Sequence, residues 1–282
     1  MPDRQGAQLG QLAAAFAAGA AAAAGVAAAL ARRRAWAPAA RVPRPHPGWA
    51  PPARQPPPHD PDAMLHLDPA ALDRGALYAL AISAVVPRPV GFTSTLSSAG
   101  AANLSPYSYF NIMCHSPPLL ALGICRAPGR GGGKKDTLAN IEATGEFVVN
   151  IMSEWFVEAA NHTCGDFAPG VDEFEQSGLQ PAASHVVAPP RVREAAVQME
   201  CKLRSVLEYD DAGGKPSSAI VIGEVVMFHV SRAVTGASPS GKVVVDPVKL
   251  APVCRLGGVT YGRVTALYDM PRPDGQGRYP AS

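Results

Sequence analysis

The sequence predicts a mainly β fold, an antiparallel barrel with a few short helices at its periphery. Two long apolar segments rich in β-branched residues, VQMECKLRSVL and AIVIGEVVMFHV, are separated by the turn sequence DDAGGKPS, which predicts a hairpin. Shorter segments of the same character precede it, and only a few short stretches favour a helix. Mostly antiparallel strands with few helices are typical of a barrel and argue against a doubly wound sheet.

Strands are expected wherever apolar and β-branched residues run between turn signals. No internal repeat is visible, so each segment is judged by itself. The expected strands are 90–96, 104–112, 118–125, 146–152, 197–209, 218–230 and 259–267.

Three short helices are expected, each preceded by a residue whose side chain can accept hydrogen bonds at a helix N-terminus. These N-caps and their helices are Asp68 with 69–80, Asp136 with 137–144, and Ser153 with 154–161. Pro69 is favoured at a first helical position, and Gly145 is expected to end the second helix.

Residues 88–111, RPVGFTSTLSSAGAANLSPYSYFN, are the most informative part of the sequence. The first half is an alternating, β-branched strand, SSAG supplies a turn, and the second half is extended and crowded with hydroxyl groups around Pro106. Such a hairpin offers hydroxyl and backbone N–H groups to a bound anion or a flat polar ring. The same composition also fits a Ser/Thr-rich edge hairpin that binds nothing.

Several further motifs follow this hairpin along the chain. They are KDT at 135–137 with NI at 140–141, GEFVVNIM at 145–152, GVDEFE at 170–175, PPRV at 189–192, the segment 199–203, VIGEVV at 221–226 and RLGGVTYGR at 255–263. In order and spacing, the hairpin and these motifs resemble the flavin reductase-like family of FMN-binding split-barrel proteins over roughly residues 68–273. The resemblance implies a Greek-key split β-barrel with FMN as its cofactor.

The resemblance also implies a set of cofactor-binding residues. They are Arg88, Thr93, Ser94, Thr95, Asn103, Leu104, Ser105, Tyr107, Ser108, Lys135, Asp136, Thr137, Tyr261 and Arg263. Lys135 and Thr137, with hairpin hydroxyl groups and a helix N-terminus, are expected to hold the phosphate. The segment 103–108 is expected to face the edge of the flavin ring. Tyr261 and Arg263 are expected to approach the flavin or stabilise a dimer, and they fit a barrel-closing strand equally well.

A hydride passes directly from nicotinamide to flavin, so the protein need not supply a general acid or base. The resemblance therefore implies an NAD(P)H-dependent flavin reductase, a homodimer that supplies reduced flavin to a partner oxygenase. One alternative is a flavin-binding protein of electron transfer or storage without efficient nicotinamide turnover, which nothing in the sequence separates from the first. Another is a tethered interaction module that has lost FMN, against which the hydroxyl-rich hairpin and the KDT motif count.

The N-terminal quarter has a different composition from the rest. Residues 12–31 form an uncharged run of 20 residues with 14 alanines, and residues 38–61 hold 10 prolines. The expected organisation is a targeting or anchor segment at 1–37, a proline-rich linker at 38–62 and the flavin reductase-like domain at 63–282. The run is long enough to span a bilayer, and the arginines after it would hold the barrel on the cytoplasmic side. Its composition also resembles an organellar transit peptide, and a plain disordered extension is the third alternative.

Other sites and partners are not indicated. The formal net charge of +2 is too small to suggest nucleic acid as a partner. The five cysteines are scattered without a C-x-x-C, which indicates neither a zinc site nor a redox dithiol and favours an intracellular location over oxidative secretion. GRGGGKK is not a P-loop, because Pro128 and Lys135 stand where glycine and Ser/Thr are required. The histidines show no ligand spacing; His229 is expected to be structural, and His115 beside Cys114 is kept as a catalytic candidate.

Overall fold

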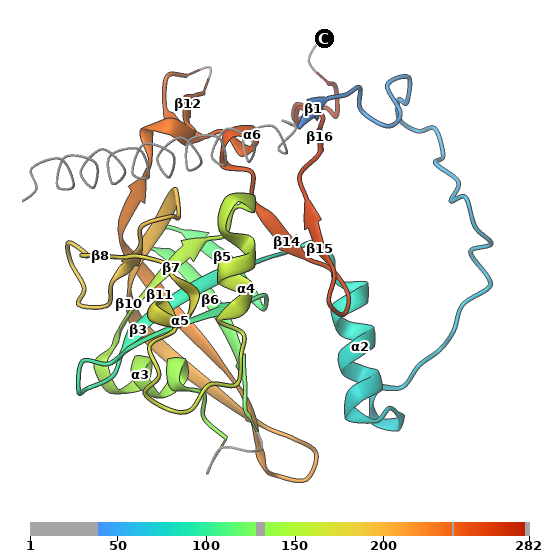
Figure 1. Cartoon of the computed structure of the whole chain (residues 1–282). Coiled ribbons are helices and arrows are strands. Elements are labelled where there is room, and N and C mark those ends of the chain that lie inside the picture. Colours follow the sequence, from blue (N-terminus) through green and yellow to red (C-terminus); the bar gives the residue numbers. More distant parts are fainter. Residues whose placement is uncertain (1–38, 128–132, 239, 280–282) are drawn as a thin grey trace, which may run out of the picture.

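The computed structural model describes residues 39–127, 133–238 and 240–279, and its centre is one antiparallel sheet (Figure 1). The strand order is β4-β3-β7-β10-β11-β6-β5. These strands are β3 (Gly91–Leu96), β4 (Ala102–Tyr107), β5 (Phe110–His115), β6 (Pro118–Cys125), β7 (Glu146–Ile151), β10 (Val197–Asp210) and β11 (Pro216–Val230). The predicted mainly β fold is confirmed.

The two edges of this sheet, β4 and β5, are consecutive in the chain. Among the described residues β4 pairs with β3 alone and β5 with β6 alone, and only Ser108 and Tyr109 join the two strands. The sheet therefore curls until its edges nearly meet but leaves a split between them. The single strand predicted at 104–112 is wrong, because the chain crosses from one edge to the other at this point.

The long hairpin of β10 and β11 is confirmed, with its turn where DDAGGKPS predicts it. The Asp211 carboxylate accepts hydrogen bonds from the backbone N–H groups of Gly213 and Lys215, at 2.9 and 3.0 Å. Farther along β11, Gly223 allows a close approach, because a Cβ at this position would collide with the ring of Phe147. Phe147 can therefore fill the core beneath this strand.

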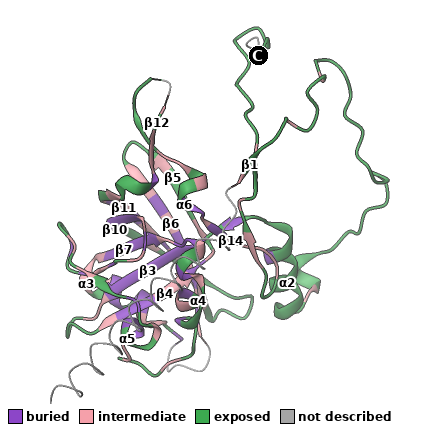
Figure 2. Ribbon diagram, turned by 45° about the horizontal axis from the view of Figure 1, so that its top comes forward, coloured by how far each residue is buried: buried purple, intermediate pink, exposed green. Residues whose placement is uncertain are grey.

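Apolar side chains pack on both faces of the sheet. One core lies under α3 (Asp136–Thr144), where Leu138 and Ile141 meet side chains of β6, β7, β10 and β11. The other core packs Phe92 and Leu104 against α4 (Val157–His162) and α5 (Glu173–Ser177). Figure 2 shows the buried central strands between these helices. Both faces of β3 and β4 are therefore covered.

The predicted helices exist, but their beginnings differ. Asp68 caps only a 3-10 turn, η1 (Pro69–Ala71), and α2 (Arg74–Ala84) begins after it, because the Asp73 carboxylate accepts from the N–H groups of Gly75 and Ala76. Asp136 is the first residue of α3 and not its N-cap. The helix after Ser153 is a 3-10 turn, η2 (Glu154–Phe156), followed by α4, and the Ser153 side chain makes no capping hydrogen bond.

Gly145 ends α3 as predicted, in a left-handed conformation with φ 71°. Helix α5 was not predicted; Asp172 caps it by accepting a hydrogen bond from the Phe174 N–H at 2.8 Å. The strand predicted at 259–267 is divided. A hairpin of β14 (Val253–Arg255) and β15 (Tyr261–Arg263) pairs with β2 (Arg88–Pro89), and the two-residue strand β16 (Ala266–Leu267) follows.

Short elements complete the fold. They are β1 (Ala40–Arg41), β8 (Pro181–Ala182), β9 (Arg191–Val192), η3 (Arg232–Val234), β12 (Thr235–Ala237), β13 (Val243–Val245) and α6 (Pro247–Leu250). β1 lies parallel to β16, so the start of the expected linker touches the C-terminal part of the chain. The proline-rich stretch after β1 carries no helix or strand and swings away from the sheet (Figure 1).

Helix α2 stands beside the β14–β15 hairpin and is largely exposed (Figure 2). Ile82 is its only buried residue, while Leu77, Tyr78 and Leu80 are exposed. Within the described part of the chain, no helix is long and apolar enough to cross a membrane. The alanine-rich run at 12–31 lies outside the described residues, so its targeting or anchoring role stays a prediction.

Candidate functional site

A cavity of about 1040 Å³ lies between α4, the β14–β15 hairpin and the end of β4. Pro106 and Ser108 line it from the main sheet, and Cys164 lines it just after α4. Pro106 is on β4, an edge strand of the sheet, so the cavity borders the split. Three of the predicted site residues reach it: Ser108, Tyr261 and Arg263.

Tyr261 and Arg263 are fixed by contacts with the opposite wall. The Tyr261 hydroxyl donates to Oδ1 of Asn161 at 3.0 Å. Burial, together with neighbouring Cys164, raises the pKa of Tyr261, so the phenol stays protonated as a donor. Nε of Arg263 lies 3.2 Å from Oε2 of Glu154, so the carboxylate neutralises the charge of Arg263. The hairpin is therefore braced against the helical wall.

Arg255, at the start of RLGGVTYGR, also lines the cavity, although sequence reasoning did not select it. Its guanidinium carbon lies 4.5 Å from the centroid of the Tyr261 ring, within cation–π distance. Burial raises the pKa of the Cys164 thiol, and the charges of Arg255 and Lys135 oppose this rise. Arg255 therefore brings positive charge to this wall of the cavity, and the charge of Lys135, which does not line the cavity, also reaches Cys164.

Arg88 is buried and acts as a clamp between α2, β2 and the hairpin. Its guanidinium donates to the carbonyl oxygens of Ile82, Val85 and Leu256, the latter two at 2.7 Å each. Nε donates to Oγ of Ser108 at 3.4 Å. In this chain Arg88 therefore positions Ser108 and α2, and its predicted contact with the cofactor remains a prediction.

The hydroxyl groups of β3 are divided between the two faces of the sheet, because successive strand residues point to opposite sides. Ser94 donates to the carbonyl oxygen of Pro190 at 2.5 Å, and Thr93 donates to the carbonyl oxygen of Gly91 at 3.2 Å. Thr95 accepts from the side-chain amides of Asn103 and Asn140, at 3.3 and 3.0 Å. All three hydroxyls of β3 are fully buried and engaged within the chain.

The N-terminus of α3 is the second place where predicted residues gather. Lys135 is its N-cap, with no side-chain hydrogen bond to the first turn, and Asp136 and Thr137 begin the helix. Oγ1 of Thr137 accepts a hydrogen bond from Nδ2 of Asn103 at 2.8 Å. Lysine offers no acceptor, so its side chain cannot cap the N–H groups of this helix end.

Tyr107 lies beside this helix end. Nζ of Lys135 is 5.9 Å from the centroid of the Tyr107 ring, and the buried Tyr107 hydroxyl has no hydrogen-bond partner among the described residues. Burial raises the pKa of Tyr107 to about 12, although the nearby hydroxyls of Thr137 and Ser105 oppose the rise. Among the described residues, Lys135 has no ion-pair partner, so an ammonium group close to a buried phenol favours an anion here.

Glu173 lies at the outer edge of β4 and was not predicted as a site residue from the sequence. Its carboxylate accepts a hydrogen bond from the backbone N–H of Leu104 at 2.9 Å. Burial raises the pKa of Glu173, and the Leu104 N–H opposes this rise. The Leu104 N–H therefore points away from β3, toward the side where the sheet has no further strand.

The comparisons with known proteins agree with this geometry. Residues 83–243, more than half of the chain, match the family described as flavin reductase like domain. The chain belongs to this flavin reductase-like family. A protein of Halalkalibacterium halodurans is 36% identical over 209 residues, which cover 74% of this chain and 97% of that protein.

Two solved structures have the same fold as this flavin reductase-like chain. Nitrilotriacetate monooxygenase component B from Bacillus cereus is 33% identical with a TM-score of 0.68, covering 74% of this chain and all of that one. A protein with a split barrel domain from Shewanella frigidimarina has a TM-score of 0.59 at 24% identity, covering 74% of this chain and 99% of that one. The resemblance seen in the motifs and the predicted split barrel are confirmed.

The donor set of this flavin reductase-like protein fits a flavin mononucleotide. The phosphate needs a cation and N–H or O–H donors, and Lys135, the N-terminus of α3 and the Tyr107 hydroxyl offer them. The ring needs a polar edge and a flat wall. Ser105 and Ser108, which are partly exposed, provide hydroxyls along the split, and Tyr261 provides an aromatic face in the cavity.

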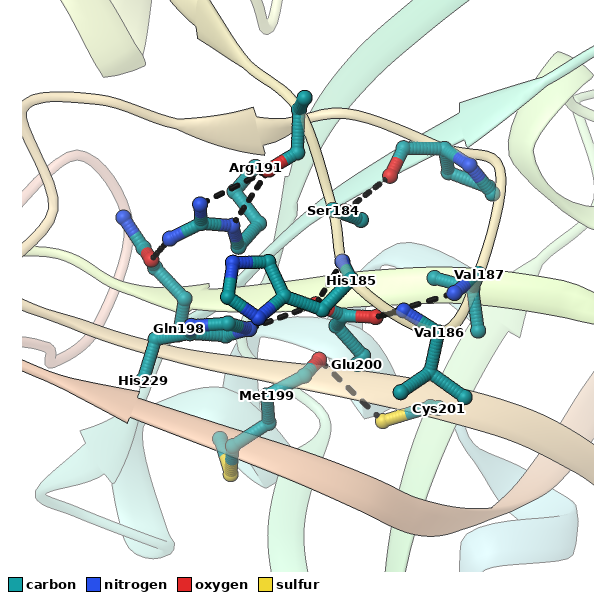
Figure 3. A network of polar contacts seen from close by, with 12 residues as sticks. Ser184, His185, Val186, Val187, Arg191, Gln198, Met199, Glu200, Cys201 and His229 are labelled. Atoms are coloured by element: carbon teal, nitrogen blue, oxygen red, sulfur yellow. Dashed lines mark hydrogen bonds and ion pairs between the residues drawn. The ribbon is translucent and has the colours of Figure 1, made fainter.

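A second polar cluster lies away from the cavity, where Glu200 of β10 is completely buried (Figure 3). Its carboxylate accepts from the N–H groups of His185, Val186 and Val187 at 2.7, 2.6 and 3.0 Å, and lies 2.5 Å from Nε2 of His229. Burial alone would raise the pKa of Glu200, but these hydrogen bonds outweigh it and lower the pKa to about 2.

This cluster holds the loop before β9 against the sheet. The same loop ends at Pro190, whose carbonyl oxygen accepts the hydroxyl of Ser94. His229 is a partner of Glu200 and does not line the cavity, as expected for a structural histidine. His115 is exposed at the end of β5 and does not line the cavity either, so the geometry gives it no catalytic position.

Proposed function

We propose that this protein is an NAD(P)H-dependent flavin reductase that binds FMN in the split between β4 and β5. The observation that carries the proposal is the N-terminus of α3, where the N-cap Lys135 makes no side-chain capping hydrogen bond and its ammonium group lies 5.9 Å from the centroid of the buried Tyr107 ring. A phosphate monoester would accept hydrogen bonds from the Lys135 ammonium group and would be favoured by the positive end of the helix dipole. The family to which the chain belongs supports flavin as the ligand.

The remaining residues would orient the ring and leave one of its faces open. The outer edge of β4 and Ser108, which Arg88 holds, lie beside the ring in this proposal. Tyr261, fixed by Asn161, forms a wall of the cavity. FMN would accept the hydride, so the protein is required only to bind, orient and exclude water. A cavity of about 1040 Å³ leaves room for a nicotinamide nucleotide beside the flavin.

An oxygenase is the proposed recipient of the reduced flavin. The support is the similarity to nitrilotriacetate monooxygenase component B, which is 33% identical over its whole length. The proposal distinguishes a reductase from a flavin-binding protein that only stores or carries electrons, because a reductase turns over nicotinamide nucleotide repeatedly.

The test uses the purified full chain. The fluorescence of FMN should be quenched when the protein is added. With excess FMN and oxygen present, NADH or NADPH should be oxidised continuously. Binding of FMN without oxidation of either nucleotide would leave an electron-transfer or storage protein. Neither binding nor oxidation would support the non-catalytic interaction module and overturn the proposed cofactor.

The protein is further proposed to be a homodimer. Helix α2 exposes Leu77, Tyr78 and Leu80, and Val85 and Val86 after it are exposed too. Exposure of this apolar surface to water is unfavourable, and a second copy of the chain would cover it. Light scattering should give twice the mass of the chain, and replacing Leu77 and Leu80 by glutamate should give a monomer. A wild-type monomer that binds FMN tightly would contradict a dimer.

A further inference from the structure

The positive charges in and near the cavity differ in how they are neutralised. Arg263 faces Glu154 across 3.2 Å, and Lys134, just before Lys135, lies 2.6 Å from Glu142. Among the described residues, no carboxylate lies within ion-pair distance of Arg255. Of the two arginines that line the cavity, Arg255 is therefore the one without an ion-pair partner among the described residues.

Arg255 is held in place without using up its donors. Its guanidinium lies against the Tyr261 ring, and Nη2 donates a hydrogen bond to the carbonyl oxygen of Gly258 at 2.5 Å. A guanidinium has five N–H donors in a planar fork that matches a phosphate. Arg255 thus presents an oriented group with donors left for a ligand, while Tyr261 is itself fixed by Asn161.

The position of Arg255 differs from that of Lys135. Arg255 lines the cavity on β14, whereas Lys135 belongs to the start of α3 and does not line it. The residues that line the cavity include two carboxylates, from Glu154 and Glu158, and two arginines, Arg255 and Arg263. The cavity as a whole does not attract anions by net charge, so recognition would depend on the oriented guanidinium itself.

We infer that Arg255 binds a phosphate group of the nicotinamide nucleotide. This inference rests on the proposed reductase function and adds the residue that recognises the second substrate. Two phosphates of that substrate have the required chemistry: the pyrophosphate, common to NADH and NADPH, and the 2′-phosphate of NADPH. The flavin phosphate lies at the α3 end in the proposed arrangement and does not meet Arg255.

Arg255→Ala tests the inference in the full-length protein. Loss of a charged hydrogen bond amounts to about 1.5–3 kcal/mol, so the KM for the nucleotide should rise about ten- to hundredfold with kcat little changed. Isothermal titration with NADP⁺ and NAD⁺ should show the same weakening without turnover. Arg255→Lys keeps the charge but loses the planar guanidinium, so its nucleotide affinity should lie between those of the wild type and Arg255→Ala. Arg204→Ala is the control, since Arg204 is exposed on β10 and pairs with Glu224.

The outcomes separate the two sources of phosphate. Weakening confined to NADP⁺ and NADPH assigns Arg255 to the 2′-phosphate, and equal weakening of both nucleotides assigns it to the pyrophosphate. Unchanged nucleotide binding overturns the inference, as does a loss of FMN affinity relative to riboflavin, which would place the flavin phosphate at Arg255. If the wild-type protein binds FMN but oxidises neither nucleotide, the proposed function fails first, whatever Arg255 does.

Discussion

Replacement of Lys135 by alanine is expected to weaken FMN binding about ten- to hundredfold and to leave riboflavin binding nearly unchanged. The ammonium group lies 5.9 Å from the centroid of the buried Tyr107 ring, at the N-terminus of α3. Charged hydrogen bonds contribute about 1.5–3 kcal/mol each, and riboflavin has no phosphate to make them. Fluorescence quenching with both flavins measures the two dissociation constants.

Lys134→Ala is the matched control, because Lys134 is the neighbouring lysine and its ammonium group pairs with Glu142 at 2.6 Å and Glu208 at 3.5 Å. It should change neither flavin affinity by more than a small factor. Equal weakening of FMN and riboflavin by Lys135→Ala would place Lys135 away from the phosphate.

Replacement of Glu200 by alanine is expected to destabilise the fold by about 3–5 kcal/mol, the range seen when one partner of a buried polar pair is removed. The change would leave the N–H groups of His185, Val186 and Val187 buried without their acceptor. Urea unfolding of the wild type and the variant measures the difference. Glu175→Ala, on the exposed side of α5, is the control and should have little effect.

The stability that Glu200 provides also depends on pH. The pKa of Glu200 is lowered from 4.5 to about 2 in the folded protein, so its charged form stabilises the fold above pH 4.5. That contribution is lost as the pH falls from 4.5 toward 2, and amounts to about 3 kcal/mol. The difference in unfolding free energy between wild type and Glu200→Gln should therefore shrink over this range. A difference that does not vary with pH would mean that Glu200 is not ionised in the folded state.

Local sequence patterns predicted most of the sheet, because strand alternation and turn residues act over short distances. The β10–β11 hairpin and the end of α3 at Gly145 follow from such signals. The break of the predicted strand at Ser108 and Tyr109 did not, since it depends on β4 and β5 pairing with different neighbours. No local pattern carries that information.

The candidate site was predicted in part, for similar reasons. The alternation of β3 already implies that Ser94 faces away from Thr93 and Thr95, so this separation was available from the sequence. Glu173 and Glu200 were missed, because a glutamate in a sequence is usually exposed and the N–H groups that satisfy these two come from distant residues. Arg255 was missed because its isolation from carboxylates is a property of the folded cavity.

The most direct test of the central claim is anaerobic mixing of the FMN-loaded protein with NADPH and, separately, with NADH. The visible absorbance of the oxidised flavin should bleach in a single rapid phase with at least one nucleotide, and oxygen should restore it. A bound flavin that keeps its oxidised spectrum with both nucleotides, but is bleached by dithionite, would contradict the assignment as a nicotinamide-dependent flavin reductase.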